Sequence, residues 1–409
     1  MRIALYTLTS PLHDEAAVNG SSAAFIKDIE SSLSTEFIFR GPDFSDFGSH
    51  DLDVIYVRTG GTEGLFREVF PLIKGHVHIL TSGKSNSLAA SMEILSFLRQ
   101  QGRSGEIIHG TVEYIAERLS MLSKVQAARK SLSGTNLGVV GQPSDWLISS
   151  HADAKAISAR LGINLVEIPI EELVCEIKAA SCGNLPEQAL KVKEKFDSCA
   201  PKALAQYADG AFSIYAALKK IVAKYNLSGL TLRCFDLLTA VGNTGCLALA
   251  ILGSEGIPAG CEGDVPALLS MAIGNALTGV CGFQSNPSRI DPESGEIVIA
   301  HCTIPLNMVS RYGFNTHFES GIGVAICGCL PTGDVTIFKV SGDLSRHFAC
   351  QASLTDNLSE KDLCRTQIVL NVADKDVCRN YFLSNPIGNH HVVFPGHHKT
   401  LFESFMESL

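Results

Sequence analysis

The apolar residues of the first 133 positions follow two alternating patterns. Short continuous runs at residues 3–6, 53–57 and 77–80 are typical of strands that are buried on both faces. Between them, the apolar residues of segment 25–33 recur at the spacing of one helix face. Strands that alternate with helices predict a doubly wound parallel sheet, which we expect as an N-terminal α/β domain over residues 1–133.

The alternation of strand and helix patterns restarts after a polar segment at residues 131–136. The strand-like and helical runs in this part are residues 137–141, 154–161, 164–168, 186–225 and 265–277. We therefore expect a second doubly wound α/β domain over residues 134–282.

From residue 283 the pattern changes to short apolar runs that are separated by Gly, Pro, Asn and Asp. These runs are residues 296–300, 323–327, 334–340, 365–372 and 391–394. A helical pattern returns only at residues 400–409. The sequence thus predicts a β-rich, barrel-like C-terminal domain over residues 283–409, after two α/β domains.

Composition excludes several classes of protein. Hydrophobic residues make up 45% and charged residues 18%, which excludes a disordered chain. The formal net charge of -9 argues against nucleic-acid binding. No apolar run approaches the roughly 18 residues of a membrane helix, and the N-terminus resembles a strand rather than a signal peptide. The 13 cysteines form no CxxC pair, so we expect buried free thiols in a cytoplasmic protein.

Histidines are unevenly distributed along the chain, which points to its last third as the first place to look for chemistry. Six lie in the first 151 residues and none between 152 and 300. The seven later ones are His301, His317, His347, His390, His391, His397 and His398.

Two carboxylates, Glu262 and Asp264, lie just before a helix that starts at Pro266. Asp264 is either the N-cap of that helix or a residue of a binding site. A cap does not account for Glu262, which is therefore a candidate metal ligand or general base.

Polar residues of the C-terminal segment are further candidates. Asn286-Pro287 predicts a turn, or an amide that faces the same site. His301 ends an apolar run and is either a structural residue or part of a site wall. His317 and Glu319 lie two residues apart and would share one face of an extended chain.

The segment Gly388-Asn389-His390-His391 pairs two histidines beside a strand. Neutral imidazole is a common metal ligand, and one histidine of the pair must point away. In the N-terminal domain, Thr62 and Glu63 follow a strand end, where parallel sheets bind ligands. Trp146, the single tryptophan, either stacks on a sugar or anchors a core.

In this order the segments resemble those of the L-fucose isomerase / L-arabinose isomerase superfamily over most of the chain. The resemblance is carried by Leu232-Arg233-Cys234-Phe235-Asp236, Cys261-Glu262-Gly263-Asp264-Val265-Pro266-Ala267-Leu268, His301-Cys302-Thr303-Ile304-Pro305, His317-Phe318-Glu319-Ser320-Gly321 and Gly388-Asn389-His390-His391. It implies two α/β domains and a β-rich domain. It also implies aldose–ketose isomerisation of a pentose or deoxyhexose through an ene-diolate, with a divalent metal, usually Mn²⁺.

The resemblance also implies roles for individual residues. Glu262, Asn286 and either His390 or His391 would hold the metal, with Glu262 and Asn286 as the catalytic pair. The substrate-binding residues would be His301, His317, Glu319, Asp264, Trp146, Thr62 and Glu63. The partners implied are a small carbohydrate and further copies of the chain, as a trimer or hexamer, with no nucleic acid and no membrane.

Position 286 departs from the family, which has Asp where this chain has Asn. An amide oxygen can coordinate a hard cation but cannot exchange a proton in the same role. The alternative function is therefore a family member that binds a sugar or a sugar derivative without isomerising it.

Overall fold

The computed structural model describes residues 2–180 and 185–409. Contacts between residues divide the chain into two compact units. The first unit comprises residues 1–130 together with 404–409, and the second comprises residues 131–403. The predicted boundary at residue 282, inside the second unit, stays a prediction.

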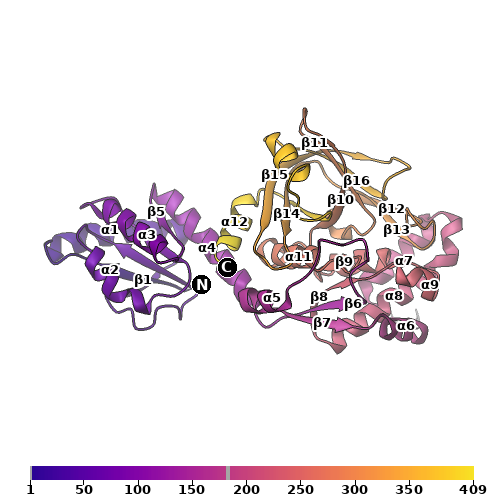
Figure 1. Cartoon of the computed structure of the whole chain (residues 1–409), viewed down its shortest axis with the longest axis horizontal. Helices are drawn as coiled ribbons and strands as arrows, with labels where there is room; N and C mark the ends of the chain where they lie inside the picture. Colours follow the sequence, from indigo (N-terminus) through magenta and orange to yellow (C-terminus); the bar gives the residue numbers. More distant parts are fainter. Residues whose placement is uncertain (1, 181–184) are drawn as a thin grey trace. The chain divides into compact units, whose positions relative to one another are not determined.

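The first unit is built on a five-stranded parallel sheet with the strand order β2-β1-β3-β4-β5. Strands β1 and β5 of this sheet are labelled in Figure 1. Its strands are β1 (Ile3–Leu8), β2 (Phe37–Gly41), β3 (Leu52–Val57), β4 (Val77–Leu80) and β5 (Gly105–Ile108). Its helices are α1 (Glu15–Leu33), α2 (Glu63–Val69), α3 (Ser87–Gln100) and α4 (Val112–Leu132). One apolar cluster joins the sheet to α2 and α3, and a second joins it to α1 and α4. Helices thus cover both faces, as the alternating pattern predicts.

The second unit begins with a four-stranded parallel sheet in the order β7-β6-β8-β9. Its strands are β6 (Asn136–Val140), β7 (Asn164–Ile168), β8 (Leu227–Leu232) and β9 (Ala259–Cys261). The helices are α5 (Ala154–Leu161), α6 (Ile170–Ala179), α7 (Glu187–Cys199), α8 (Ala205–Lys224), α9 (Asp236–Val241), α10 (Cys246–Ser254) and α11 (Val265–Thr278). The helical pattern at 186–225 is two helices, because Pro201 cannot continue a helix from Cys199.

The rest of the second unit contains a closed barrel in the order β10-β11-β16-β15-β14-β17, which is orange to yellow in Figure 1. Its strands are β10 (Phe283–Asp291), β11 (Glu296–His301), β14 (Gly333–Val340), β15 (His347–Leu358), β16 (Thr366–Asn371) and β17 (His391–Pro395). A small antiparallel pair joins β12 (Arg311–Asn315) to β13 (Ala325–Cys329), and α12 (Lys399–Glu407) follows the barrel. The barrel-like prediction is confirmed.

Two predictions, one about the Asn286-Pro287 segment and one about the cysteines, are wrong. Asn286-Pro287 is not a turn but lies inside β10, where the register to β11 shifts between Pro287 and Arg289. Such a bulge accommodates a proline, which has no N–H to donate. The cysteines are not all buried: Cys175 and Cys199 are exposed, and Cys182 lies outside the described residues. Among the helices that are described, none is long and apolar enough to cross a membrane.

The close approach of α11 to β17 generates a test of the packing. A Cβ atom at Gly274 would lie 2.0 Å from the ring of Phe394, which is fully buried. We predict that Gly274→Ala destabilises the protein by about 1–3 kcal/mol, because the core cannot give way without strain. Thermal unfolding followed by circular dichroism measures it.

Gly20 supplies the matched control, since it lies inside helix α1 and a Cβ there would meet nothing within 4 Å. Gly20→Ala should leave stability unchanged or raise it by up to about 1 kcal/mol through helix propensity. A Gly274→Ala protein as stable as the wild type would contradict the close packing described.

Candidate active site

Glu262 occupies a constrained turn between β9 and α11, at the carboxyl end of the second sheet. Its φ of 66° lies in the left-handed region, which costs a non-glycine residue about 1–3 kcal/mol. The carbonyl of Glu262 accepts a hydrogen bond from the Ser144 N–H at 2.9 Å. Gln284 binds both backbone groups of Cys261, at 2.8 and 3.3 Å. These bonds fix the backbone from which the Glu262 side chain extends.

Three side chains converge on the carboxylate of Glu262. Its Oε1 lies 3.5 Å from His390 Nε2 and 3.8 Å from His301 Nε2. The two imidazole rings lie 5.5 Å apart and nearly perpendicular. The other carboxylate oxygen of Glu262, Oε2, accepts a hydrogen bond from Trp146 Nε1 at 2.6 Å. His301 Nδ1 is hydrogen-bonded to Thr303 Oγ1 at 3.0 Å, which directs Nε2 toward Glu262.

Asp264 orients His390 from behind. Its Oδ2 accepts the Nδ1–H of His390 at 2.8 Å and lies 3.6 Å from Lys339 Nζ. Its Oδ1 accepts the N–H of Ala267 at 2.8 Å, so the predicted N-cap is confirmed. With Nδ1 occupied, the Nε2 atom of His390 faces Glu262 and has no hydrogen-bond partner among the described residues.

The charged groups of the site shift one another's pKa values. Burial opposes ionisation of Glu262, but the imidazoles of His301 and His390 outweigh it and hold the pKa of the carboxyl well below its usual range. Burial likewise opposes the charge on Asp264, yet Lys339 and His390 lower its pKa to about 2. Burial disfavours the charged form of His390, while Asp264 and Glu262 raise its pKa to about 9. The two carboxylates are thus ionised at neutral pH.

The residues Glu262, His301 and His390 form a group that could hold a metal ion. The three potential ligand atoms lie within 4.8 Å of one another. An unpartnered, buried imidazole nitrogen that faces a carboxylate is a feature that an ion would satisfy. The carboxylate that accepts the other ring N–H of His390 is the usual outer partner of a metal-binding histidine.

His391 and Asn286 are placed differently from His390. Both ring nitrogens of His391 are occupied: Nδ1–H donates to Asn389 O and Nε2 accepts from Tyr381 OH, each at 2.9 Å. Of the two adjacent histidines, the structure therefore brings His390 to Glu262. Asn286 on β10 pairs with Ala300 on the neighbouring strand β11, and its Oδ1 accepts a hydrogen bond from Asn389 Nδ2 at 3.4 Å. It lies next to the segment that carries His390, but its ligand role stays a prediction.

The predicted substrate-binding residues fall in several places. The Trp146 ring is half exposed and packs edge-on against Phe235 at 4.8 Å, and Phe235 in turn packs against His317 at 5.4 Å. His317 and Glu319 do not share the face of an extended chain, because the segment turns and Gly321 N–H donates to His317 O. Glu319 is exposed.

Thr62 and Glu63 belong to the first unit and begin helix α2. Thr62 is fully buried, and its hydroxyl donates to Thr59 O at 3.1 Å.

Sequence reasoning named His301 and Trp146 but missed their contacts with Glu262, and it did not name Gln284 or Lys339. The pairing of His301 with Glu262, the bond from Trp146 to Glu262 and the role of Gln284 all join parts of the chain that are far apart in sequence. Lys339 could have been noticed, because a lysine within the apolar run 334–340 is unusual for a buried strand.

Comparison with known proteins gives the class to which the chain is similar. No protein-family model matches it. It is 24% identical over 268 residues, 62% of this chain and 59% of the relative, to a sulfoquinovose isomerase of Alkalicoccus urumqiensis. It is 30% identical over 240 residues, 56% of this chain and 52% of the relative, to a sulfoquinovose isomerase of Clostridium sp. (strain MSTE9). The matches thus span just over half the length of these sugar isomerases.

The position of Asp264 behind His390 generates a prediction about metal affinity. In Asp264→Asn, the amide can still cap α11, but the negative charge that faces His390 Nδ1–H is lost. We expect about 10–100-fold weaker Mn²⁺ binding, measured by titration calorimetry. The exposed Asp362, changed to Asn, serves as the control and should bind as the wild type does. Equal affinity in the two variants would contradict the orienting role.

Proposed function

We propose that the chain is a divalent-metal-dependent sugar isomerase, which interconverts an aldose and a ketose at the site around Glu262. The observation that carries the proposal is the buried cluster in which the carboxylate of Glu262 faces the Nε2 atoms of His301 and His390. The similarity to two sulfoquinovose isomerases supports the same reaction class.

The two carboxylate oxygens of Glu262 have different surroundings, and we assign them different roles, metal binding and proton transfer. Oε1 faces the imidazoles of His301 and His390, so these three residues would hold the ion. Oε2 is oriented by Trp146, whose ring reaches solvent, and we assign it the proton transfer. A bound divalent ion would stabilise the negative charge that develops on the sugar oxygens.

In this scheme the carboxylate accepts the proton from the hydroxyl-bearing carbon next to the carbonyl group. It returns the proton to the former carbonyl carbon, while one proton moves between the two oxygens. Asp264 keeps His390 oriented, and Lys339 keeps Asp264 ionised although both side chains are buried. His317 is proposed to orient a sugar hydroxyl, whereas both ring nitrogens of His301 are already assigned, to the ion and to Thr303.

Sulfoquinovose, the sugar named for both relatives, is the first substrate to test for this chain, beside pentoses and deoxyhexoses. Asn286 prompted the alternative of a protein that binds a sugar without isomerising it. The set Glu262, His301 and His390 supplies three potential ligands without Asn286, which favours the isomerase.

The variant Glu262→Gln tests the function. Wild-type protein with Mn²⁺ should exchange the C2 proton of its substrate sugar with solvent deuterium, as followed by NMR. The variant should lose this exchange by about 10²–10⁴-fold, because a neutral amide cannot accept the proton.

Glu296→Gln is the matched control for this test, as the exposed first residue of β11 in the same unit. It should exchange at the wild-type rate. If the metal-loaded wild type binds a sugar but exchanges the C2 proton of none of the sugars tested, the isomerase proposal is wrong. That result would support the alternative of a protein that binds a sugar without isomerising it.

Trp146→Phe tests the assignment of Oε2. The change keeps an aromatic ring against Phe235 but removes the N–H that donates to Glu262. Since a bond to a charged group contributes about 1.5–3 kcal/mol, kcat should fall roughly 10–100-fold with a smaller change in KM. Steady-state kinetics measures both. A change confined to KM would point to a role in sugar binding instead.

A further inference from the structure

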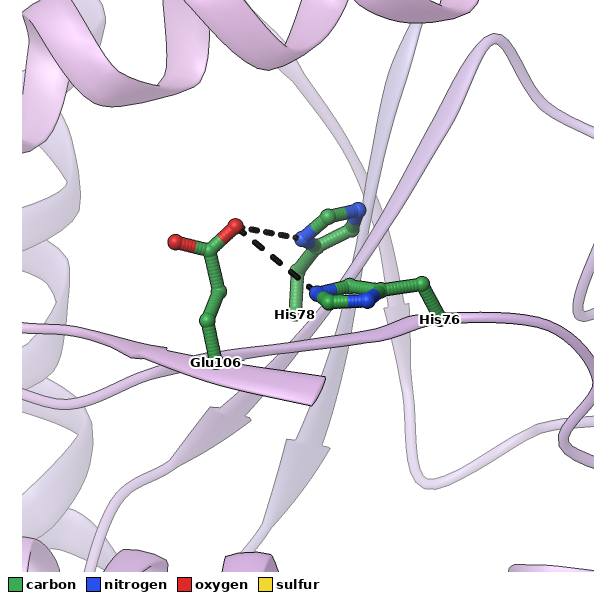
Figure 2. Close-up of side chains that lie close together, drawn as sticks. All are labelled: His76, His78 and Glu106. Carbon is green, nitrogen blue, oxygen red and sulfur yellow. Dashed lines mark hydrogen bonds and ion pairs between the residues drawn. The ribbon is translucent and has the colours of Figure 1, made fainter. Parts of the chain in front are cut away.

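A second group of metal-ligating side chains lies in the first unit. Figure 2 shows Glu106 facing the rings of His78 and His76, with all three side chains on one side of the sheet. The group is separate from the site around Glu262, which belongs to the second unit. It also lies at the amino ends of its strands, whereas Thr62 and Glu63 follow the carboxyl end of β3.

The register of two neighbouring strands brings the three side chains together. His78 on β4 is the direct partner of Glu106 on β5. His76 precedes β4 by one residue and, being two positions from His78, points to the same face. Helix α4 covers this face and contributes Arg118.

The distances between the side chains are those of a potential coordination group. Glu106 Oε1 lies 3.2 Å from His78 Nδ1 and 4.0 Å from His76 Nε2. The rings of His76 and His78 are 4.9 Å apart. The three potential ligand atoms all fall within 4.8 Å of one another. Ligands at about 2.0–2.2 Å from a tetrahedral ion are roughly 3.3–3.6 Å apart, which lies between the two distances from Glu106 Oε1, 3.2 and 4.0 Å.

Neighbouring groups already orient two of the three side chains. Ser104 Oγ is hydrogen-bonded to His76 Nδ1 at 3.1 Å, which leaves Nε2 directed at Glu106. Arg118 holds both oxygens of Glu106, with Nε at 2.8 Å and Nη2 at 3.0 Å. Such outer partners are typical of ligating imidazoles and carboxylates. Each carboxylate oxygen has a second lone pair, so the Arg118 bonds leave Oε1 able to coordinate.

We propose that His76, His78 and Glu106 form a binding site for a zinc-like divalent ion. Two imidazoles and one carboxylate are the donors that Zn²⁺ accepts, whereas Mg²⁺ and Ca²⁺ prefer oxygen ligands alone. Three protein ligands leave a fourth position for water or another small ligand. His78 is buried while Glu106 is partly exposed, so the ion would be reached from the side of Glu106.

An ion at this site would stabilise the first unit. It would join β4 to β5, and Arg118 connects Glu106 onward to Ser404, whose hydroxyl accepts a bond from Nη1 at 2.7 Å. Residues 404–409 belong to the first unit although they end the chain. The ion would thus reinforce the part of the fold that holds the C-terminal residues, because it binds only the folded state.

The experiment uses the whole chain, stripped of metal with a chelator and titrated with Zn²⁺ alone. His76→Gln removes one ligand at a strand end, and His13→Gln is the control, since His13 is an exposed histidine of the same unit. Calorimetry should show a Zn²⁺ site of equal affinity in the wild type and in His13→Gln. In His76→Gln the affinity of this site for Zn²⁺ should be more than about tenfold weaker. Zn²⁺ should raise the melting temperature of the first two proteins more than that of His76→Gln.

Glu262→Gln separates this site from the one in the second unit. Glu262→Gln should still bind Zn²⁺ at His76, His78 and Glu106. The double variant, Glu262→Gln with His76→Gln, should lose this binding. Melting in chelator checks folding: His76→Gln should unfold near the wild-type temperature. Two results would overturn the proposal. One is that Glu262→Gln and the variant with both substitutions bind Zn²⁺ equally well, and the other is that Glu262→Gln binds no Zn²⁺.

Discussion

The buried carboxylate of Asp264 is the interaction on which the candidate active site depends. It caps α11, accepts the Nδ1–H of His390 just before β17, and lies 3.6 Å from Lys339 on β14. A buried charge is tolerated only when it is paired and hydrogen-bonded. The same pairing therefore joins the β9–α11 turn to two barrel strands and presents His390 Nε2 to Glu262.

Around this anchor the site combines backbone strain with converging charge. Glu262 adopts a left-handed conformation that Gly263 shares, and a Cβ at Gly263 would lie 2.5 Å from Gln142 O. The tight turn thus has room for a glycine after Glu262 and for little else. Strain of this kind persists where surrounding contacts determine it, here through Ser144 and Gln284. The result is a carboxylate whose two oxygens face different partners.

The sequence indicated much of the fold and the central residue of the site. Continuous apolar runs located most parallel strands, and the change of pattern after residue 282 indicated the barrel. Strand β5 was not located from the pattern, because it is short and only half buried. Helix α4, which follows it, was not located either. Glu262 stood out because no cap explained it. The choice between His390 and His391 needed the structure, since adjacent residues point to opposite faces and the sequence does not say which face.

By itself, then, the sequence determined the alternation of strands and helices and the concentration of late histidines, and it made Asp264 a candidate cap, because these follow from local spacing and residue type. Only the tertiary structure decided which polar side chains meet. Glu262 reaches His301, His390 and Trp146 across 39, 128 and 116 residues of chain, as the difference in their numbers gives. Likewise, His78 meets Glu106 only through the register of β4 and β5. Contacts of this kind depend on how sheets pair and pack, which local periodicity does not specify.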